Sequence, residues 1–277
     1  MQKKDFSDWL VVSDIDGTLN DKYRRTVKAN IEAVSEFTKN GGNFTIASGR
    51  GLQSALKIYD RLDTFTPLIF LNGAGIYDNE NKKLLSFQGI TLKGQAIVFE
   101  ITERYKTKIE LAVHTDDMIY LVKPRIFGKT FTFIDKLDHK ICNSLFEVPK
   151  NDWGKVTMFG NRNIIREIKG FVDGNRDCEI KAVLTSPFTL EIINVTADKG
   201  NAVKRLAKIL GIEKHRTAAI GDYYNDLDML KTVAVPACCR KAPKEVKAIS
   251  KYCACDANKG AVADFLQYLT KNYINKD

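Results

Sequence analysis

The sequence predicts an α/β protein with a Rossmann-like, doubly wound parallel sheet as its core and an inserted α+β domain. Short apolar strands alternate with amphipathic helices toward both ends of the chain, which is typical of parallel sheets joined by helical crossovers. Between these regions, strands with alternating apolar and polar residues indicate an antiparallel sheet with one polar face. We therefore expect a core made of residues 1–83 and 187–277, and an inserted domain over 84–186.

The composition is that of an ordinary globular protein, with 44% hydrophobic and 28% charged residues. No run of about 20 apolar residues occurs, and residues 1–9 are polar and not a basic run before an apolar core, so we expect neither membrane spanning nor secretion. The six cysteines lack paired C-x-x-C spacing, which favours reduced thiols and a cytoplasmic protein. The formal charge is +9, but no dense basic run is interleaved with aromatic residues, so nucleic-acid binding is not expected and anionic small molecules suit this charge equally well.

The first predicted strand, Leu10–Val12, is apolar throughout and runs directly into two carboxylates, Asp14 and Asp16. A helix should follow, capped by Thr26 and ended by the Gly41–Gly42 pair. The apolar residues of this helix fall on one face and are Val27, Ile31, Val34 and Phe37.

Two more strands, 43–48 and 67–71, flank a helix over 52–62 and end in polar turns. The first turn reads Ser48-Gly49-Arg50 and the second reads Asn72-Gly73. In a parallel sheet, ligands gather beyond the carboxyl ends of the strands, near the point where strand order reverses. These turns therefore join the two carboxylates as parts of one candidate site. The stretch 76–87 predicts a hairpin, which would serve as a flap over that site.

The inserted domain is expected to combine two helices with several strands. The helices are predicted over 94–105 and 163–171, and the strands over 109–114, 118–122, 156–159 and 179–184.

The parallel pattern is expected to resume with a strand over 188–195 and a helix over 198–210, which ends at Gly211. The next strand, 217–220, is followed by Gly221-Asp222-Tyr223-Tyr224-Asn225-Asp226, so a second core strand is followed by carboxylates. The remaining elements predicted are a helix over 227–231, a strand over 233–235, a helix over 243–249, and a final strand and helix.

An i, i+2 pair of carboxylates at the end of a strand can point toward one place. Asp14 and Asp16 would then repel each other unless a cation or a shared proton intervenes. The alternative is an ordinary polar Asp-Gly turn. Lys199 lies in the first turn of its helix, where a cation opposes the helix dipole, so a nearby anion is plausible, although a solvated lysine is the simpler explanation.

Four motifs, in this order along the chain, resemble the signature motifs of the haloacid dehalogenase superfamily, and most closely its Cof-type phosphatase branch with a large α+β cap. They are Asp14-Ile15-Asp16-Gly17-Thr18, Ser48-Gly49-Arg50, Lys199 and Gly221-Asp222-x-x-Asn225-Asp226. Three further stretches look like the same branch: Asn72-Gly73-Ala74, Asp198-Lys199-Gly200 and Gly260-Ala261-Val262-Ala263.

The resemblance implies that Asp14 is the nucleophile and forms an aspartyl phosphate, while Asp16 is first general acid and then general base. It also implies Mg²⁺ as cofactor, held by Asp14, the main-chain carbonyl of Asp16, and Asp222. It further implies that Lys199 is a catalytic residue that donates to phosphoryl oxygens.

The implied phosphate- or substrate-binding residues come from three turns and are Ser48, Gly49, Arg50, Asn72 and Asn225. Asp226 would support Lys199 or a metal-bound water. Asn225 or Asp226 could instead cap the turn after Asp222. One stretch, Pro236-Ala237-Cys238-Cys239-Arg240, departs from the small Gly-Asn-Ala turn that this branch often has, which leaves the shape of that loop open.

These implications describe a Mg²⁺-dependent phosphatase of small phosphate monoesters, with sugar phosphates as the first expectation and flavin mononucleotide or pyridoxal phosphate as the second. A phosphomutase of the same superfamily and a catalytically silent phosphate-binding regulatory module are the alternatives. The expected partner is a small-molecule phosphate ester, not nucleic acid or a membrane, and the protein is expected to be a monomer or homodimer. Candidates for substrate selection lie at strand ends of the inserted domain, where a solvated turn is equally compatible: His114, Asp116, Asp117, Lys123 and Arg125.

Overall fold

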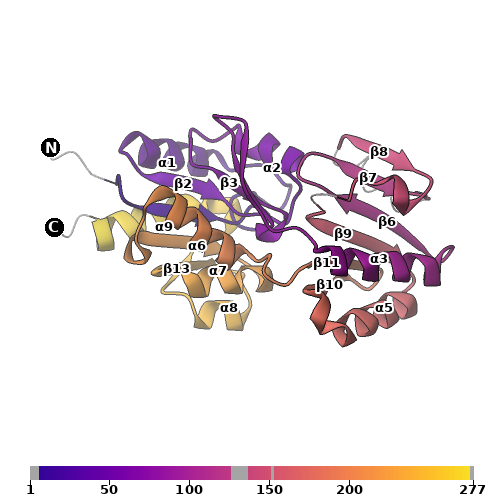
Figure 1. Ribbon diagram of the computed structural model, residues 1–277. Helices are drawn as coiled ribbons and strands as arrows, with labels where there is room; N and C mark the ends of the chain where they lie inside the picture. Colours follow the sequence, from indigo (N-terminus) through magenta and orange to yellow (C-terminus); the bar gives the residue numbers. More distant parts are fainter. Residues whose placement is uncertain (1–5, 126–136, 151–152, 275–277) are drawn as a thin grey trace. The chain divides into compact units, whose positions relative to one another are not determined.

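The computed structural model describes residues 6–125, 137–150 and 153–274, which divide into two compact units (Figure 1). The first unit takes the described residues up to Gly49, Ala55–Leu85 and those from Asp198 onward. The second takes Arg50–Ser54 and the described part of Ser86–Ala197. The predictions made for residues 1–5 and for 126–136 and 151–152 of the inserted domain lie outside the described residues. No helix in the described ranges is long and apolar enough to cross a membrane.

The first unit is built on five parallel strands in the order β14-β13-β12-β1-β2. Their bounds are Leu10–Ser13 for β1, Asn43–Ile46 for β2, Thr217–Gly221 for β12, Val235–Cys239 for β13 and Tyr252–Ala254 for β14. The chain leaves β1 for β2 on one side and returns to β12 on the other, so the strand order reverses between β1 and β12. This is the position at which open α/β sheets bind ligands.

In its described residues the first unit also has the helices α1 (Lys28–Lys39), α6 (Lys199–Leu210), α7 (Leu227–Thr232), α8 (Lys244–Ala248) and α9 (Ala261–Leu269), and most of α2 (Leu52–Tyr59). Leu10 and Val12 point to one face of the sheet, where they share a core with Leu206 of α6, Met229 of α7 and Val246 of α8. All five side chains are at most 1% exposed. Each such buried side chain contributes roughly 1.5–3 kcal/mol, and together they fix β1 in the middle of the sheet.

A hairpin extends the first unit, as the sequence predicts. Strands β4 (Gly75–Asp78) and β5 (Lys83–Phe87) are neighbours in a three-stranded sheet, and β4 also pairs antiparallel with β3 (Leu68–Phe70). An isolated parallel bridge between Ala47 and Ile69 brings β3 alongside the end of β2. The role of the hairpin as a flap stays a prediction.

The second unit has a six-stranded sheet in the order β10-β11-β9-β6-β7-β8. The strands are β6 (Ile109–His114), β7 (Ile119–Val122), β8 (His139–Cys142), β9 (Lys155–Gly160), β10 (Ile180–Ser186) and β11 (Thr189–Asn194). All neighbours pair antiparallel except β7 and β8, which are parallel. One face packs against α3 (Leu92–Tyr105) and α5 (Arg162–Gly174) through alternate strand residues such as Leu111 and Met158. An α/β core with an inserted α+β domain is therefore confirmed.

The strand expected over 188–195 belongs to the inserted domain and not to the core. It is β11, which pairs with β10 and β9, and its residues Leu190 and Ile192 are buried in the α3 and α5 core. The second unit therefore continues to Ala197, beyond the predicted boundary at 186. An apolar run of this length suits either sheet, and only the pairing decides between them.

Two local predictions are also corrected. Thr26 does not cap α1, because its hydroxyl donates to Asn20 Oδ1 at 2.9 Å, and Val27 stands at the N-cap without a side-chain bond. The stretch from Pro236 to Cys239 is not a loop but most of β13, and the strand expected over 233–235 begins only at Val235. All five residues of β13 are buried, which small apolar side chains allow between two neighbouring strands.

Candidate active site

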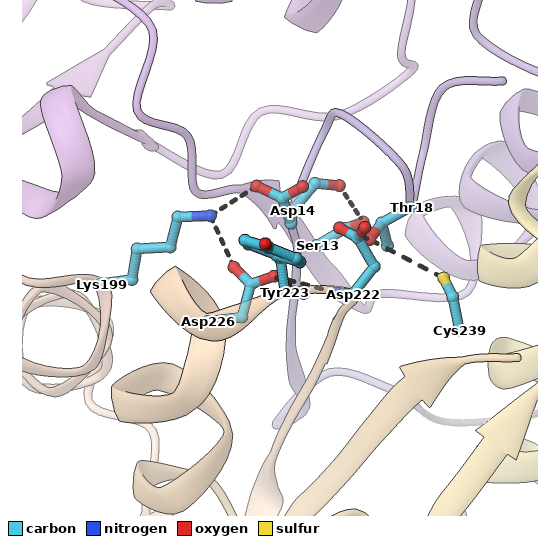
Figure 2. A network of polar contacts seen from close by, with 8 residues as sticks. All are labelled: Ser13, Asp14, Thr18, Lys199, Asp222, Tyr223, Asp226 and Cys239. Carbon is cyan, nitrogen blue, oxygen red and sulfur yellow. Dashed lines mark hydrogen bonds and ion pairs between the residues drawn. The ribbon is translucent and has the colours of Figure 1, made fainter. Parts of the chain in front are cut away.

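Four charged side chains converge beyond the ends of β1 and β12 (Figure 2). Lys199 Nζ lies 2.5 Å from Asp14 Oδ1 and 2.6 Å from Asp226 Oδ1, and Asp222 completes the group. The side chains of Lys199 and Asp226 are 0% exposed, and that of Asp14 is 8% exposed. A buried lysine between two carboxylates is a specific arrangement, not a solvated side chain.

The backbone places these groups. The Asp14 amide donates to Ile220 O of β12 at 3.0 Å, so the ends of β1 and β12 stay in register. Gly17 has φ +87°, and a Cβ at this position would lie 2.4 Å from Asp222 Oδ2, so only glycine allows the loop after β1 to approach that carboxylate. Lys199 enters from the first turn of α6, whose N-cap is Asp198.

The loop after β3 meets the start of α6 in a similarly close contact. Gly73 has φ +97°, and a Cβ there would lie 2.2 Å from Asp198 O. The Arg205 guanidinium donates to Gly73 O at 2.6 Å. These contacts hold the first turn of α6, and with it Lys199, against the loop.

The charges of the group do not balance. Burial alone would lower the pKa of Lys199, but Asp14 and Asp226 outweigh it and raise that pKa above its usual value, so the ammonium stays charged. Burial raises the pKa of Asp14, with Lys199 opposing the rise and Asp226 and Asp222 adding to it. Burial, followed by the charge of Asp226, raises the pKa of Asp222 to about 6. Three carboxylates thus face one ammonium, and a further cation would relieve the repulsion.

The donor set suits Mg²⁺, which prefers hard oxygen ligands. Oxygens of Asp14, Asp222 and Asp226 lie within 4.8 Å of one another. Asp226 is the least available of the three, because Oδ1 contacts Lys199 and Oδ2 accepts the amides of Asp222 and Tyr223. Asp14 and Asp222 remain as the side chains that could hold the ion. The described contacts of Asp226 thus hold Lys199 and cap the turn after Asp222, and the sequence analysis had considered both roles for this residue.

Asp16, Ser48 and Asn72 lie on the loops that surround this group. The Asp16 side chain is exposed, and its charge contributes to the raised pKa of Asp222, so the two carboxylates are near each other. Ser48 is buried, and its carbonyl accepts the Asn72 amide at 2.8 Å. Gly49 packs on the Asn72 side chain, since a Cβ on Gly49 would lie 2.8 Å from Asn72 Oδ1. The turns after β2 and β3 are therefore adjacent, as predicted.

Two predicted binding residues have other surroundings. The Arg50 guanidinium donates to Ser54 Oγ at 3.0 Å, and both residues fall in the second unit. Asn225 is exposed on the short turn Tyr224–Asp226. Their assignment to phosphate stays a prediction.

Thr18 and Cys239 are site neighbours that the sequence analysis missed. The Thr18 hydroxyl donates to Asp222 Oδ1 at 3.2 Å, and Cys239 Sγ lies 3.8 Å from Thr18 Oγ1 (Figure 2). Thr18 directly follows Asp16 and Gly17, so the motif already contained its signal. No sequence pattern indicated Cys239, because its contact with Thr18 depends on where β13 lies in the sheet.

The five residues proposed for substrate selection in the inserted domain have different surroundings: some bond within their own turn or are exposed, and one is buried. Asp117 accepts from Thr115 Oγ1 at 2.9 Å within a tight turn, and Arg125 donates its backbone amide to Glu110. Lys123 is exposed and Asp116 is half-buried. His114 is 2% exposed, its ring contacts Thr157 Oγ1 at 3.2 Å, and burial, together with the charge of Lys155, lowers its pKa well below the usual value. His114 is therefore a neutral, buried polar group.

Comparison with known proteins identifies the family of the chain. The family model of haloacid dehalogenase-like hydrolases matches residues 11–266. The chain belongs to this hydrolase family. The predicted resemblance and the prediction of a hydrolase are confirmed.

Two curated relatives align over most of the chain. A Streptococcus pyogenes protein, provisionally named a phosphatase, is 29% identical over 92% of this chain and 95% of its own length. The 5-amino-6-(5-phospho-D-ribitylamino)uracil phosphatase of Bacillus subtilis is 27% identical over 94% of this chain and 97% of its own length. Among solved structures, a haloacid dehalogenase-like hydrolase from Bacteroides thetaiotaomicron shares the fold with a TM-score of 0.85 at 19% identity, covering 94% of this chain and 99% of that one.

Proposed function

We propose that this hydrolase is a Mg²⁺-dependent phosphatase of small phosphate monoesters. The observation that carries the proposal is the buried group Asp14, Lys199, Asp226 and Asp222 at the switch point of the sheet. A phosphoryl group needs a nucleophile, fixed positive charge and a proton donor within one pocket. In this proposal Asp14 is the nucleophile, Lys199 the fixed positive charge, and Asp16, on the loop after β1, the proton donor. The names of the two curated relatives, both phosphatases, support the same activity.

Asp14 is the nucleophile in this proposal. Its carboxylate attacks phosphorus, the ester oxygen leaves, and the phosphoryl group is held on Asp14 as an aspartyl phosphate. Asp16 donates the proton that the leaving oxygen needs, and then takes a proton from the water that hydrolyses the aspartyl phosphate. Its exposed side chain suits this exchange, while the burial of Asp14 keeps water from competing as an acceptor.

Lys199 stabilises negative charge on the phosphoryl oxygens, and Asp226 holds the ammonium in place. Asp14, Asp222 and the main-chain carbonyl of Asp16 would hold Mg²⁺, which when bound neutralises the carboxylates and the phosphate. Ser48 and Asn72, whose turns are adjacent, would donate to the phosphoryl group.

We further propose that the inserted domain is the cap and selects the substrate. The face of its sheet that lacks α3 and α5 carries buried polar groups: His114, Thr157 and an ion pair of 2.7 Å between Lys155 and Glu191. Hydroxyl-rich leaving groups suit such donors and acceptors, so sugar and polyol phosphates are the first candidates, and flavin mononucleotide and pyridoxal phosphate the second. The ribityl phosphate substrate in the name of the Bacillus subtilis relative belongs to the first class.

The test is phosphate release from p-nitrophenyl phosphate and from a panel of sugar, polyol, nucleotide and cofactor phosphates, with Mg²⁺ and with excess EDTA. We expect turnover with Mg²⁺, loss of turnover in EDTA, and the highest kcat/KM among sugar or polyol phosphates. Binding of phosphate without turnover of any ester would instead indicate a regulatory module. Transfer to a second hydroxyl of the same sugar would indicate a phosphomutase.

A further inference from the structure

Two thiols of the first unit face each other across neighbouring strands. Cys238 of β13 and Cys253 of β14 are register partners in the parallel pair. Neighbouring strands lie about 4.8 Å apart, and disulfides form when the two Cα atoms are about 4.4–6.8 Å apart. Register partners also project to the same face of the sheet, so their side chains are neighbours without any change of fold.

The surroundings of the two thiols differ in a way that suits oxidation. Cys253 is exposed on the edge strand, whereas Cys238 is buried beside Val246 of α8. Burial raises the pKa of the Cys238 thiol, a hydrogen bond with Ser250 opposes the rise, and the adjacent thiol of Cys253 adds to it. The exposed thiol is therefore open to an oxidant, and the buried thiol is adjacent to it.

The backbone on both sides of Cys253 is fixed by α9. The ring of Tyr252 stacks on Tyr268 at 4.0 Å, and its hydroxyl donates to Asp264 Oδ1 at 2.8 Å. On the other side, the Cys255 amide donates to Asp264 Oδ2 at 2.7 Å. These contacts keep β14 in register, so Cys253 stays opposite Cys238.

The pair is also connected to the acidic group. Cys238 is the register partner of Gly221 on β12, the residue directly before Asp222. The next residue, Cys239, contacts Thr18 Oγ1, and Thr18 donates to Asp222 (Figure 2). A covalent bond at Cys238 would therefore shift backbone that is one residue from Asp222 on β12 and one residue from Cys239 on β13.

We propose that Cys238 and Cys253 are a redox modification site, in which a peroxide joins the two thiols as a reversible disulfide and thereby weakens Mg²⁺ activation. The second part rests on the proposed function, and the first does not. The spacing of neighbouring strands lies near the short end of the disulfide range, so the bond should be easily reduced, as regulatory disulfides are.

The chemistry balances in two steps. The Cys253 thiol is oxidised by one hydrogen peroxide to a sulfenic acid, which releases one water. The Cys238 thiol then attacks that sulfur, the S–S bond forms, and the hydroxyl leaves as a second water. A dithiol such as dithiothreitol returns both thiols.

The first test identifies the bond without measuring activity. The reduced protein is treated with hydrogen peroxide, alkylated, digested with trypsin without reduction and analysed by mass spectrometry. We expect a cross-linked pair of the peptides 232–240 and 252–259, with fragmentation assigning the bond to Cys238 and Cys253, and its loss after dithiothreitol. Cys253→Ser should abolish the cross-link, while the matched control Cys255→Ser, two residues away on the same segment, should retain it.

The second test measures the half-saturating Mg²⁺ concentration for p-nitrophenyl phosphate turnover. We expect a rise of up to about tenfold on oxidation of the wild type and of Cys255→Ser, reversed by dithiothreitol, and no change for Cys253→Ser. A disulfide through Cys239 or Cys255 would overturn the assignment of the bond to Cys238 and Cys253. Oxidation of the thiols by peroxide without any cross-link would overturn it as well. A cross-link that leaves Mg²⁺ activation unchanged would overturn its effect on the enzyme. Absence of turnover in the reduced protein would overturn the proposed function, and the cross-link would still decide the thiol chemistry.

Discussion

Gly17 and Asp222, from opposite ends of the chain, approach so closely that a single added carbon at residue 17 would come within 2.4 Å of the Asp222 carboxylate. The loop after β1 and the loop after β12 are thus fitted to each other at the position proposed for Mg²⁺.

The first prediction tests this fit with Gly17→Ala. The added Cβ should displace Asp222 and raise the Mg²⁺ concentration needed for activity by at least about tenfold. The positive φ should also cost roughly 1–3 kcal/mol of unfolding free energy. The matched control is Gly211→Ala, because Gly211 has φ +70° but nothing within 4 Å of its Cβ position. Both variants should lose stability in urea unfolding, and only Gly17→Ala should lose Mg²⁺ activation. Equal Mg²⁺ activation in the two variants would contradict the fit.

The second prediction separates the two carboxylates of the first motif. Asp14→Asn should form no phosphoenzyme with any substrate, because the nucleophile is gone. Asp16→Asn should still be phosphorylated by p-nitrophenyl phosphate, whose leaving group needs little protonation, but hydrolysis should slow by about 10²- to 10⁴-fold. Rapid-quench measurement of acid-stable phosphoprotein should therefore show accumulation only in Asp16→Asn. Covalent phosphate in Asp14→Asn would assign the nucleophile to another residue.

The third prediction concerns the buried charges around Lys199. Lys199→Met leaves Asp14 and Asp226 without their cation, so the unfolding free energy in EDTA should fall by about 3–5 kcal/mol. The double variant Lys199→Met with Asp226→Asn removes one of the two carboxylates and should recover part of that loss, although activity should stay absent. Full recovery of activity in the double variant would show that Lys199 acts only on stability.

The fourth prediction concerns pH and metal together. The pKa of Asp222 is raised by burial from its usual value near 3.8 to about 6, and that of Asp14 is raised as well. A carboxyl with a raised folded-state pKa stabilises the protein below its unfolded pKa, and this contribution is lost as pH rises through the folded value. Through Asp222 the metal-free protein should therefore lose stability between about pH 4 and pH 6, and Mg²⁺, which binds the ionised carboxylates, should restore it.

Thermal unfolding with and without Mg²⁺ at several pH values measures this effect. The increase in Tm on adding Mg²⁺ should grow from pH 5 to pH 8, and it should be smaller and flatter in Asp222→Asn. An increase that shrinks as pH rises would contradict the assignment of these carboxylates to the metal.

The sequence predicted the core of the site because its residues directly follow apolar strands. Asp14 and Asp222 could be placed at one sheet edge from strand order alone, since parallel strands end on the same side. Lys199 was singled out because a cation at the start of a helix is locally unfavourable. The structure adds that Asp226 is shared between the ammonium and two backbone amides, which no pattern of residue types encodes.

Other features depend on pairing and could not be predicted. Strand β11 has the apolar character of a core strand, and only its hydrogen-bonded neighbours place it in the inserted domain. The Pro236–Cys239 stretch was expected as a loop because the resembling branch often has a small turn there, yet its position between β12 and β14 makes it a buried strand. The neighbouring thiols of Cys238 and Cys253 follow from that same register.

The central position of β1 has a consequence for folding during synthesis. Leu10 pairs with Asn43 on one side and with Thr217 on the other, so one edge of β1 has its partner early and the other must wait for most of the chain. Until β12 leaves the ribosome, that edge presents unpaired backbone groups. The nascent chain can complete the sheet of its inserted domain before the sheet that carries Asp14, and the acidic group forms only with the last third of the protein.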